Sequence, residues 1–134
     1  MTTGQNIYPT FRYRDAAAMI EWLEKAFGFA VHEQHMQGDK VGHAELALGG
    51  SIIMVGDARD DKFGGMVGEP GENGGKALYI ALDDVDAVYA TARVAGAKIL
   101  QEPVNRDYGS REFICADPQG NVWSFGTYHP QARS

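Results

Sequence analysis

The sequence predicts an α+β fold made of two tandem βαβββ modules, because the same order of elements occurs twice. Amphipathic helices are indicated between Asp15 and Gly28 and between Asp84 and Gly96, each starting after an aspartate and ending at a glycine. The two capping aspartates are about half of the 134-residue chain apart. One helix cannot cover both faces of a sheet, so we expect the two modules to pair into a curved mixed sheet with an open cavity and with helices on the outer face.

Each predicted helix follows one strand and precedes three others, all with apolar residues at alternate positions. The whole chain, residues 1–134, is predicted to be one domain, with module 1 at about 5–56 and module 2 at about 76–128. A linker loop at 57–75 is rich in glycine and acidic residues, and either connects the modules or covers a site. The predicted strands are 7–14, 29–36, 41–48 and 51–57 in module 1 and 76–83, 97–104, 110–117 and 121–128 in module 2.

Composition excludes several classes of partner. The net charge of −6 argues against binding to nucleic acid or to an anionic membrane. No apolar run approaches the roughly 18 residues of a membrane span, and the N-terminal residues show no signal peptide. The single cysteine, Cys115, excludes an intramolecular disulfide, and we expect it to be a core residue in a cytoplasmic protein.

Alternation assigns each strand residue to one face of its sheet. Leu78, Ile80 and Leu82 form an apolar set that should meet a helix, as should Trp123 and Phe125. The opposite face mixes aromatic, apolar and ionisable side chains, which suits a small-molecule cavity but also a dimer interface, and the two are compatible. The residues predicted on this face are Tyr8, Thr10, Arg12, His43, Glu45, Met54, Tyr79, Ser124, Glu112 and Ile114.

The repeat and its motifs together resemble the vicinal-oxygen-chelate superfamily of glyoxalase I, bleomycin-resistance proteins and extradiol dioxygenases. The motifs include Gly42-His43-Ala44-Glu45-Leu46, Leu82-Asp83-Asp84-Val85 and Asp117-Pro118-Gln119-Gly120-Asn121. The chain is most similar to the small bacterial glyoxalase-like and bleomycin-resistance-like members. The resemblance implies a homodimer, and it leaves the reaction open because this fold serves many functions.

The resemblance also implies four metal-ligand positions, one each on the first and last strands of the two modules. In this sequence these positions hold Tyr8, Met54, Tyr79 and Ser124. Phenols, a thioether and a hydroxyl are poor ligands for a divalent metal, so we expect the family's usual metal to be absent and no other cofactor to be bound.

The leading hypothesis is a protein that binds a small organic molecule in the cup of the sheet. Tyr8 and Tyr79 offer aromatic faces to a planar or cationic ligand, and Met54 offers an adaptable apolar contact. Arg12 and Arg111 are candidate anchors for a carboxylate or phosphate on the ligand, although Arg111 would equally serve to hold a loop.

Three alternatives remain. A metal-free acid–base enzyme would use Glu45 or Glu112 as its catalytic residue, since a partly apolar cup raises the pKa of a carboxyl group. A displaced metal site would use His43 and Glu45, with a third ligand from Glu112, His32 or His35. A structural or regulatory homodimer would keep only a vestigial cavity.

Overall fold

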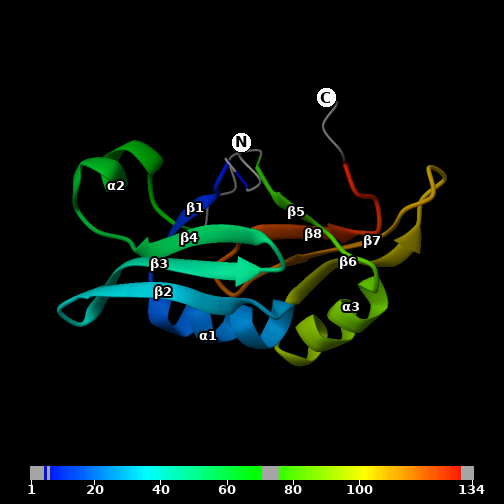
Figure 1. Ribbon diagram of the computed structural model, residues 1–134, viewed down its shortest axis with the longest axis horizontal. Helices are drawn as coiled ribbons and strands as arrows, with labels where there is room; N and C mark the ends of the chain where they lie inside the picture. Colours follow the sequence, from blue (N-terminus) through cyan, green and yellow to red (C-terminus); the bar gives the residue numbers. More distant parts are fainter. Residues whose placement is uncertain (1–4, 6, 71–75, 131–134) are drawn as a thin grey trace. The chain divides into compact units, whose positions relative to one another are not determined.

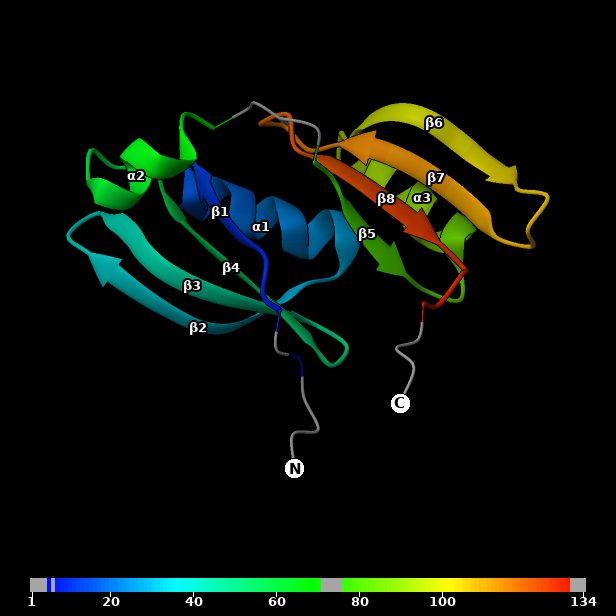
Figure 2. The same cartoon turned by 90° about the horizontal axis from the view of Figure 1, so that it is seen from above.

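The computed structural model describes the whole chain except residues 1–4, 6, 71–75 and 131–134. It divides into two compact units, Met1–Gly71 and Glu72–Ser134. Each unit contains a four-stranded mixed sheet with a long helix against one of its faces (Figures 1 and 2). This confirms the predicted α+β class.

The first unit has the strand order β1-β4-β3-β2, in which β1 is parallel to β4 and the other pairs are antiparallel. Its long helix, α1, begins after Asp15, whose side chain accepts a hydrogen bond from the backbone of Ala18, and ends at Gly28 in the left-handed conformation. The elements are β1 (Thr10–Tyr13), α1 (Ala16–Phe27), β2 (Ala30–Gln37), β3 (Lys40–Leu48) and β4 (Ser51–Asp57).

The second unit repeats this topology with the order β5-β8-β7-β6, again with one parallel pair, β5 and β8. Its helix α3 begins after Asp84, whose side chain accepts from the backbone of Ala87. The elements are β5 (Leu78–Ala81), α3 (Val85–Val94), β6 (Lys98–Asn105), β7 (Arg111–Ala116) and β8 (Val122–Gly126).

The core of each unit lies between the sheet and its helix. In the second unit, Phe113, Trp123 and Phe125 are fully buried, and the rings of Phe113 and Phe125 stack with centroids 4.7 Å apart. Tyr89 of α3 meets Phe113 edge-on at 5.4 Å. Burying each such ring contributes roughly 1.5–3 kcal/mol, so these alternate positions fix which strand residues face away from the helix.

The predicted linker contains a short helix that the sequence pattern does not show. This helix, α2 (Lys62–Val67), begins after Asp61, whose side chain accepts from the backbone of Gly64. Asp57, where the predicted strand 51–57 meets the predicted linker, is the last residue of β4. Residues 71–75 of the linker lie outside the described part of the chain. Among the described residues, no helix has the length and apolar character needed to cross a membrane.

Candidate functional site

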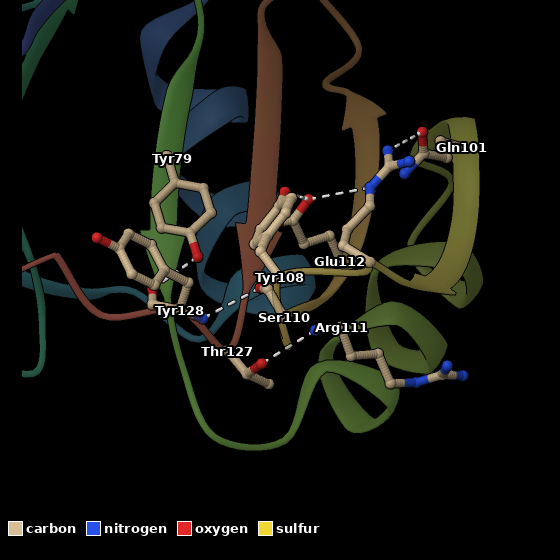
Figure 3. Close-up of polar contacts among 9 residues, drawn as sticks. Tyr79, Gln101, Tyr108, Ser110, Arg111, Glu112, Thr127 and Tyr128 are labelled. Atoms are coloured by element: carbon tan, nitrogen blue, oxygen red, sulfur yellow. Dashed lines mark hydrogen bonds and ion pairs between the residues drawn. The ribbon is translucent and has the colours of Figure 1, made fainter.

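A cluster of polar and aromatic side chains surrounds Glu112 on the face of the second sheet that points away from α3 (Figure 3). The hydroxyl of Tyr108 donates to both carboxylate oxygens of Glu112, at 2.8 and 2.9 Å. The Nε of Arg106 lies 3.3 Å from Oε1 of the same carboxylate, and Nη2 of Arg106 donates to Gln101 at 2.8 Å. Only 14% of the Glu112 side chain is exposed. Its carboxylate is therefore fixed in position.

The hairpin between β6 and β7 brings these groups together. The backbone N–H of Arg106 donates to the carbonyl of Ser110 at 2.7 Å, and the N–H of Gly109 donates to the carbonyl of Arg106 at 3.1 Å. Gly109 has a φ of 92°, a conformation that glycine adopts without strain. This tight turn folds Arg106 and Tyr108 back over Glu112.

The pKa of Glu112 is lowered. Burial, the largest influence, raises it, but hydrogen bonds from Tyr108, Ser110 and Arg106 and the positive charge of Arg106 together outweigh burial. The same hydrogen bond to Glu112 raises the pKa of the Tyr108 phenol. The expectation of a raised pKa was therefore wrong for Glu112. The hairpin supplies hydrogen-bond donors that stabilise the ionised carboxylate, and a partly apolar cup alone would not.

Tyr79 lies next to this carboxylate, on β5. Its hydroxyl donates to the carbonyl of Tyr128 at 2.6 Å, and burial is the main cause of the raised pKa of its phenol. Gly126 makes room for both side chains, because a Cβ there would lie 2.5 Å from the Tyr79 hydroxyl and 2.9 Å from Cγ of Glu112. Ser124 is paired directly with Tyr79 in the register of β5 and β8, as predicted for this face.

The first sheet carries the other predicted pair, His43 and Glu45, on β3. Nε2 of His43 is 3.1 Å from Oε2 of Glu45, and Nε2 of His32 is 4.0 Å from Oε1 of Glu45. Met54 of β4 lies across from Glu45 on one side and from Thr10 of β1 on the other.

Arg12 is already engaged within the first unit. Its guanidinium forms two hydrogen bonds of 3.2 Å to the carboxylate of Asp61 and lies over the ring of Phe63, 4.9 Å from the centroid. The hydrogen bond from Arg12 is the main reason that the pKa of Asp61 falls to about 2. Arg12 therefore connects α2 to β1. It lines a hollow of about 370 Å³ together with residues 58–60, 64–65 and 68–70. Tyr8 donates its hydroxyl to the carbonyl of Gln5 at 2.7 Å.

Arg111 lies apart from Glu112 in spite of being its neighbour in sequence. Its guanidinium pairs with both oxygens of Asp86 in the first turn of α3, at 2.9 Å each, and with Asn105 at 3.1 Å. Figure 3 shows its side chain directed away from that of Glu112. The structure thus supports the structural role for Arg111.

Sequence reasoning missed Arg106, Tyr108 and Tyr128 as members of the cluster. Arg106 and Tyr108 lie between the predicted strands 97–104 and 110–117, and Tyr128 is the last residue of the predicted strand 121–128, in alternation with Ser124. A usable signal was the Tyr108-Gly109 pair, since a glycine between two strands indicates a tight hairpin that can return its side chains to the sheet.

The fold and this cluster define a class of protein that has two tandem βαβββ units and a sheet face carrying polar and aromatic side chains. Comparison with known proteins gives the family. The family model described as the Glyoxalase/Bleomycin resistance protein/Dioxygenase superfamily matches residues 7–125. The chain belongs to this superfamily.

Relatives and solved structures are also similar over most of this chain. An uncharacterized protein of Mycobacterium bovis is 34% identical over 116 residues, which are 84% of this chain and 76% of the relative. The crystal structure of TioX from Micromonospora sp. ML1 is similar with a TM-score of 0.76 and 27% identity, covering 92% of this chain and 98% of that one. Glyoxalase I from Zea mays shares the fold, with a TM-score of 0.73 and 19% identity over 92% of this chain and 44% of that one.

The side chains at the family's metal positions do not fit a divalent metal. In the first unit Thr10 of β1 is paired with Met54 of β4, and in the second unit Tyr79 of β5 is paired with Ser124 of β8. Thr10, rather than Tyr8, is therefore the residue of the first unit that occupies the position equivalent to Tyr79. None of these side chains is an imidazole, a carboxylate or a thiolate. Phenols, hydroxyls and thioethers are poor ligands for a divalent metal.

Proposed function

We propose that this protein binds a small organic molecule on the face of the second sheet around Glu112, without the metal that its family usually holds. The observation that carries the proposal is the fixed carboxylate of Glu112 beside exposed phenol rings. Tyr79 is 38% exposed and Tyr108 is 63% exposed, so both side chains are accessible next to an ionised group. Such a combination of aromatic surface and a placed polar anchor is typical of ligand sites.

The chemistry of the cluster favours a planar cation. Tyrosine faces attract cations and stack on flat rings. Arg106 donates to Oε1 of Glu112 and the neutral Tyr108 hydroxyl to Oε2, and a carboxylate oxygen can accept a second hydrogen bond, here from an amine of the ligand. The net charge of −6 also favours the approach of a cation.

Acid–base catalysis by Glu112 has less support. A general base works best when its pKa lies near the working pH, and the pKa of Glu112 is lowered instead. A homodimer remains part of the proposal on the strength of the family resemblance, and light scattering of the purified chain tests it.

The test uses proflavine, a planar aromatic cation, with metal-stripped protein. We expect saturable fluorescence titration at one site per chain, with proflavine recovered unchanged by mass spectrometry. Glu112→Gln should weaken binding at least tenfold, about 1.4 kcal/mol. The matched control is Glu102→Gln, an exposed glutamate on β6 of the same sheet, which should bind as the unchanged protein does.

The anionic dye 1-anilinonaphthalene-8-sulfonate completes the experiment. The site should prefer proflavine, and the anionic dye should respond little to Glu112→Gln. Equal proflavine affinity in the Glu112→Gln and Glu102→Gln variants, or no proflavine binding at all, would refute the proposal.

A further inference from the structure

Ionisable side chains of β2 and β3 lie together on one face of these two strands. A register shift in β2 adds His32 to this group. Glu33 is paired directly with Glu45, and His35 with His43. The register shifts between Val31 and Glu33, so two residues of β2 share one partner position on β3. This shift brings the side chain of His32 to the same side as that of Glu33.

The side chains of His32, Glu33 and Glu45 lie close enough to one another to reach a single metal ion. One ligand atom from each lies within 4.8 Å of the others, and Nε2 of His32 is 4.0 Å from Oε1 of Glu45. Ligands at about 2.0–2.2 Å from a tetrahedral zinc ion lie roughly 3.3–3.6 Å from one another. His32 and Glu33 are exposed, so small side-chain rotations close the remaining distance.

Two further histidines orient the carboxylates of this group. Nε2 of His35 is 3.1 Å from Oε1 of Glu33, and Nε2 of His43 is 3.1 Å from Oε2 of Glu45. The two imidazole rings stack, with centroids 6.1 Å apart and planes 24° apart. Each carboxylate therefore has one oxygen held by a histidine and the other available, an arrangement that supports metal ligands in known sites.

The electrostatics of the pair also favour a cation. Glu33 and Glu45 are directly opposite each other across two antiparallel strands, where like charges destabilise the pairing. A divalent cation between the two carboxylates would offset their mutual repulsion. Imidazole together with carboxylate oxygen is a ligand set that zinc accepts.

We propose that His32, Glu33 and Glu45 bind a zinc-like divalent cation on the β2–β3 ribbon, with His35 and His43 holding the two carboxylates. This site is separate from the strand positions that hold the metal in the family. It does not depend on the proposed organic ligand, whose residues all belong to the second unit.

The test is calorimetric titration of tag-free, chelator-stripped full chain with Zn²⁺ and, separately, Ni²⁺. We expect one Zn²⁺ per chain. His32→Ala and Glu45→Gln should each weaken binding at least tenfold, and His43→Ala should weaken it about tenfold through loss of its hold on Glu45. The matched control is His129→Ala, an exposed histidine of the second unit, which should bind as the unchanged chain does.

A second measurement identifies the ligands directly. Co²⁺ should give the visible absorption of a site containing nitrogen and oxygen donors, and His32→Ala should remove or shift that band. Circular dichroism of each variant should match the unchanged chain, since His32 is exposed and Glu45 is on the face away from α1. No stoichiometric Zn²⁺, or equal affinity in the His32→Ala, Glu45→Gln and His129→Ala variants, would overturn the proposal.

Discussion

Gly126→Ala probes the arrangement of Tyr79 and Glu112 without removing a functional group. A Cβ at Gly126 would lie 2.5 Å from the Tyr79 hydroxyl and 2.9 Å from both Cγ of Glu112 and Cε1 of Tyr79. Ordinary van der Waals contact begins at 3.4 Å. The Tyr79 hydroxyl must therefore move by roughly 1 Å, and Glu112 by several tenths of an ångström.

The structural cost of this movement is small because the contacts are side-chain atoms. Tyr79 loses its 2.6 Å hydrogen bond to the carbonyl of Tyr128, worth about 0.5–1.5 kcal/mol net. The midpoint of thermal unfolding should fall by roughly 2–5 °C. Proflavine binding should weaken about tenfold, since both the aromatic face and the carboxylate are displaced.

The assay compares unfolding midpoint and proflavine affinity in Gly126→Ala and Gly50→Ala. A Cβ at Gly50 would meet no heavy atom within 4 Å, and Gly50 has no positive φ, so alanine there should change neither quantity. Unchanged proflavine affinity in Gly126→Ala would refute the description of this face. A loss of binding equal in both variants would do the same.

Three other predictions concern single groups. Burial raises the pKa of the Cys115 thiol to about 12, so the native protein should resist Ellman's reagent at mildly alkaline pH and react only when unfolded; rapid reaction of the native state would contradict this. The pKa of Asp61 in the folded protein is about 2, below its ordinary value of 3.8. Its contact with Arg12 should therefore stabilise the fold fully above about pH 4 and lose this effect as the pH falls through about 2, and an NMR titration midpoint near 3.8 would disprove it. Asp117→Ala removes a buried acceptor that takes hydrogen bonds from the Trp123 indole at 3.0 Å and from the turn backbone at 2.9 and 3.1 Å. Urea unfolding should show a loss of roughly 2–4 kcal/mol, and a loss well below about 1 kcal/mol would be inconsistent with those bonds.

Much of the fold followed from strong local signals. Asp15 and Asp84 cap the helices as expected, since each side chain accepts a backbone N–H in the first turn. Alternation placed Phe125 in the core and Ser124 on the opposite face, because the register is fixed wherever one face is buried. These features depend on neighbouring residues, which the sequence displays directly.

The remaining features depend on contacts between distant residues. The helix α2 is short and has no apolar stripe, and it is held by Arg12 through Asp61, 49 positions away. The position of His32 beside Glu33 comes from a register shift between β2 and β3, which no pattern within β2 reveals. Arg111 is a different case. It directly precedes Glu112 in one strand, and successive strand residues point to opposite faces, so alternation places Arg111 on the face that meets the helix.

The most direct test of small-molecule binding around Glu112 is an NMR titration of metal-stripped, isotope-labelled protein with proflavine. Binding there predicts saturable shifts at one site per chain, concentrated on β5, β7 and the Arg106–Ser110 hairpin. Shifts confined to other strands, no saturable shifts, or shifts that appear only after a divalent metal is added would contradict the proposed site.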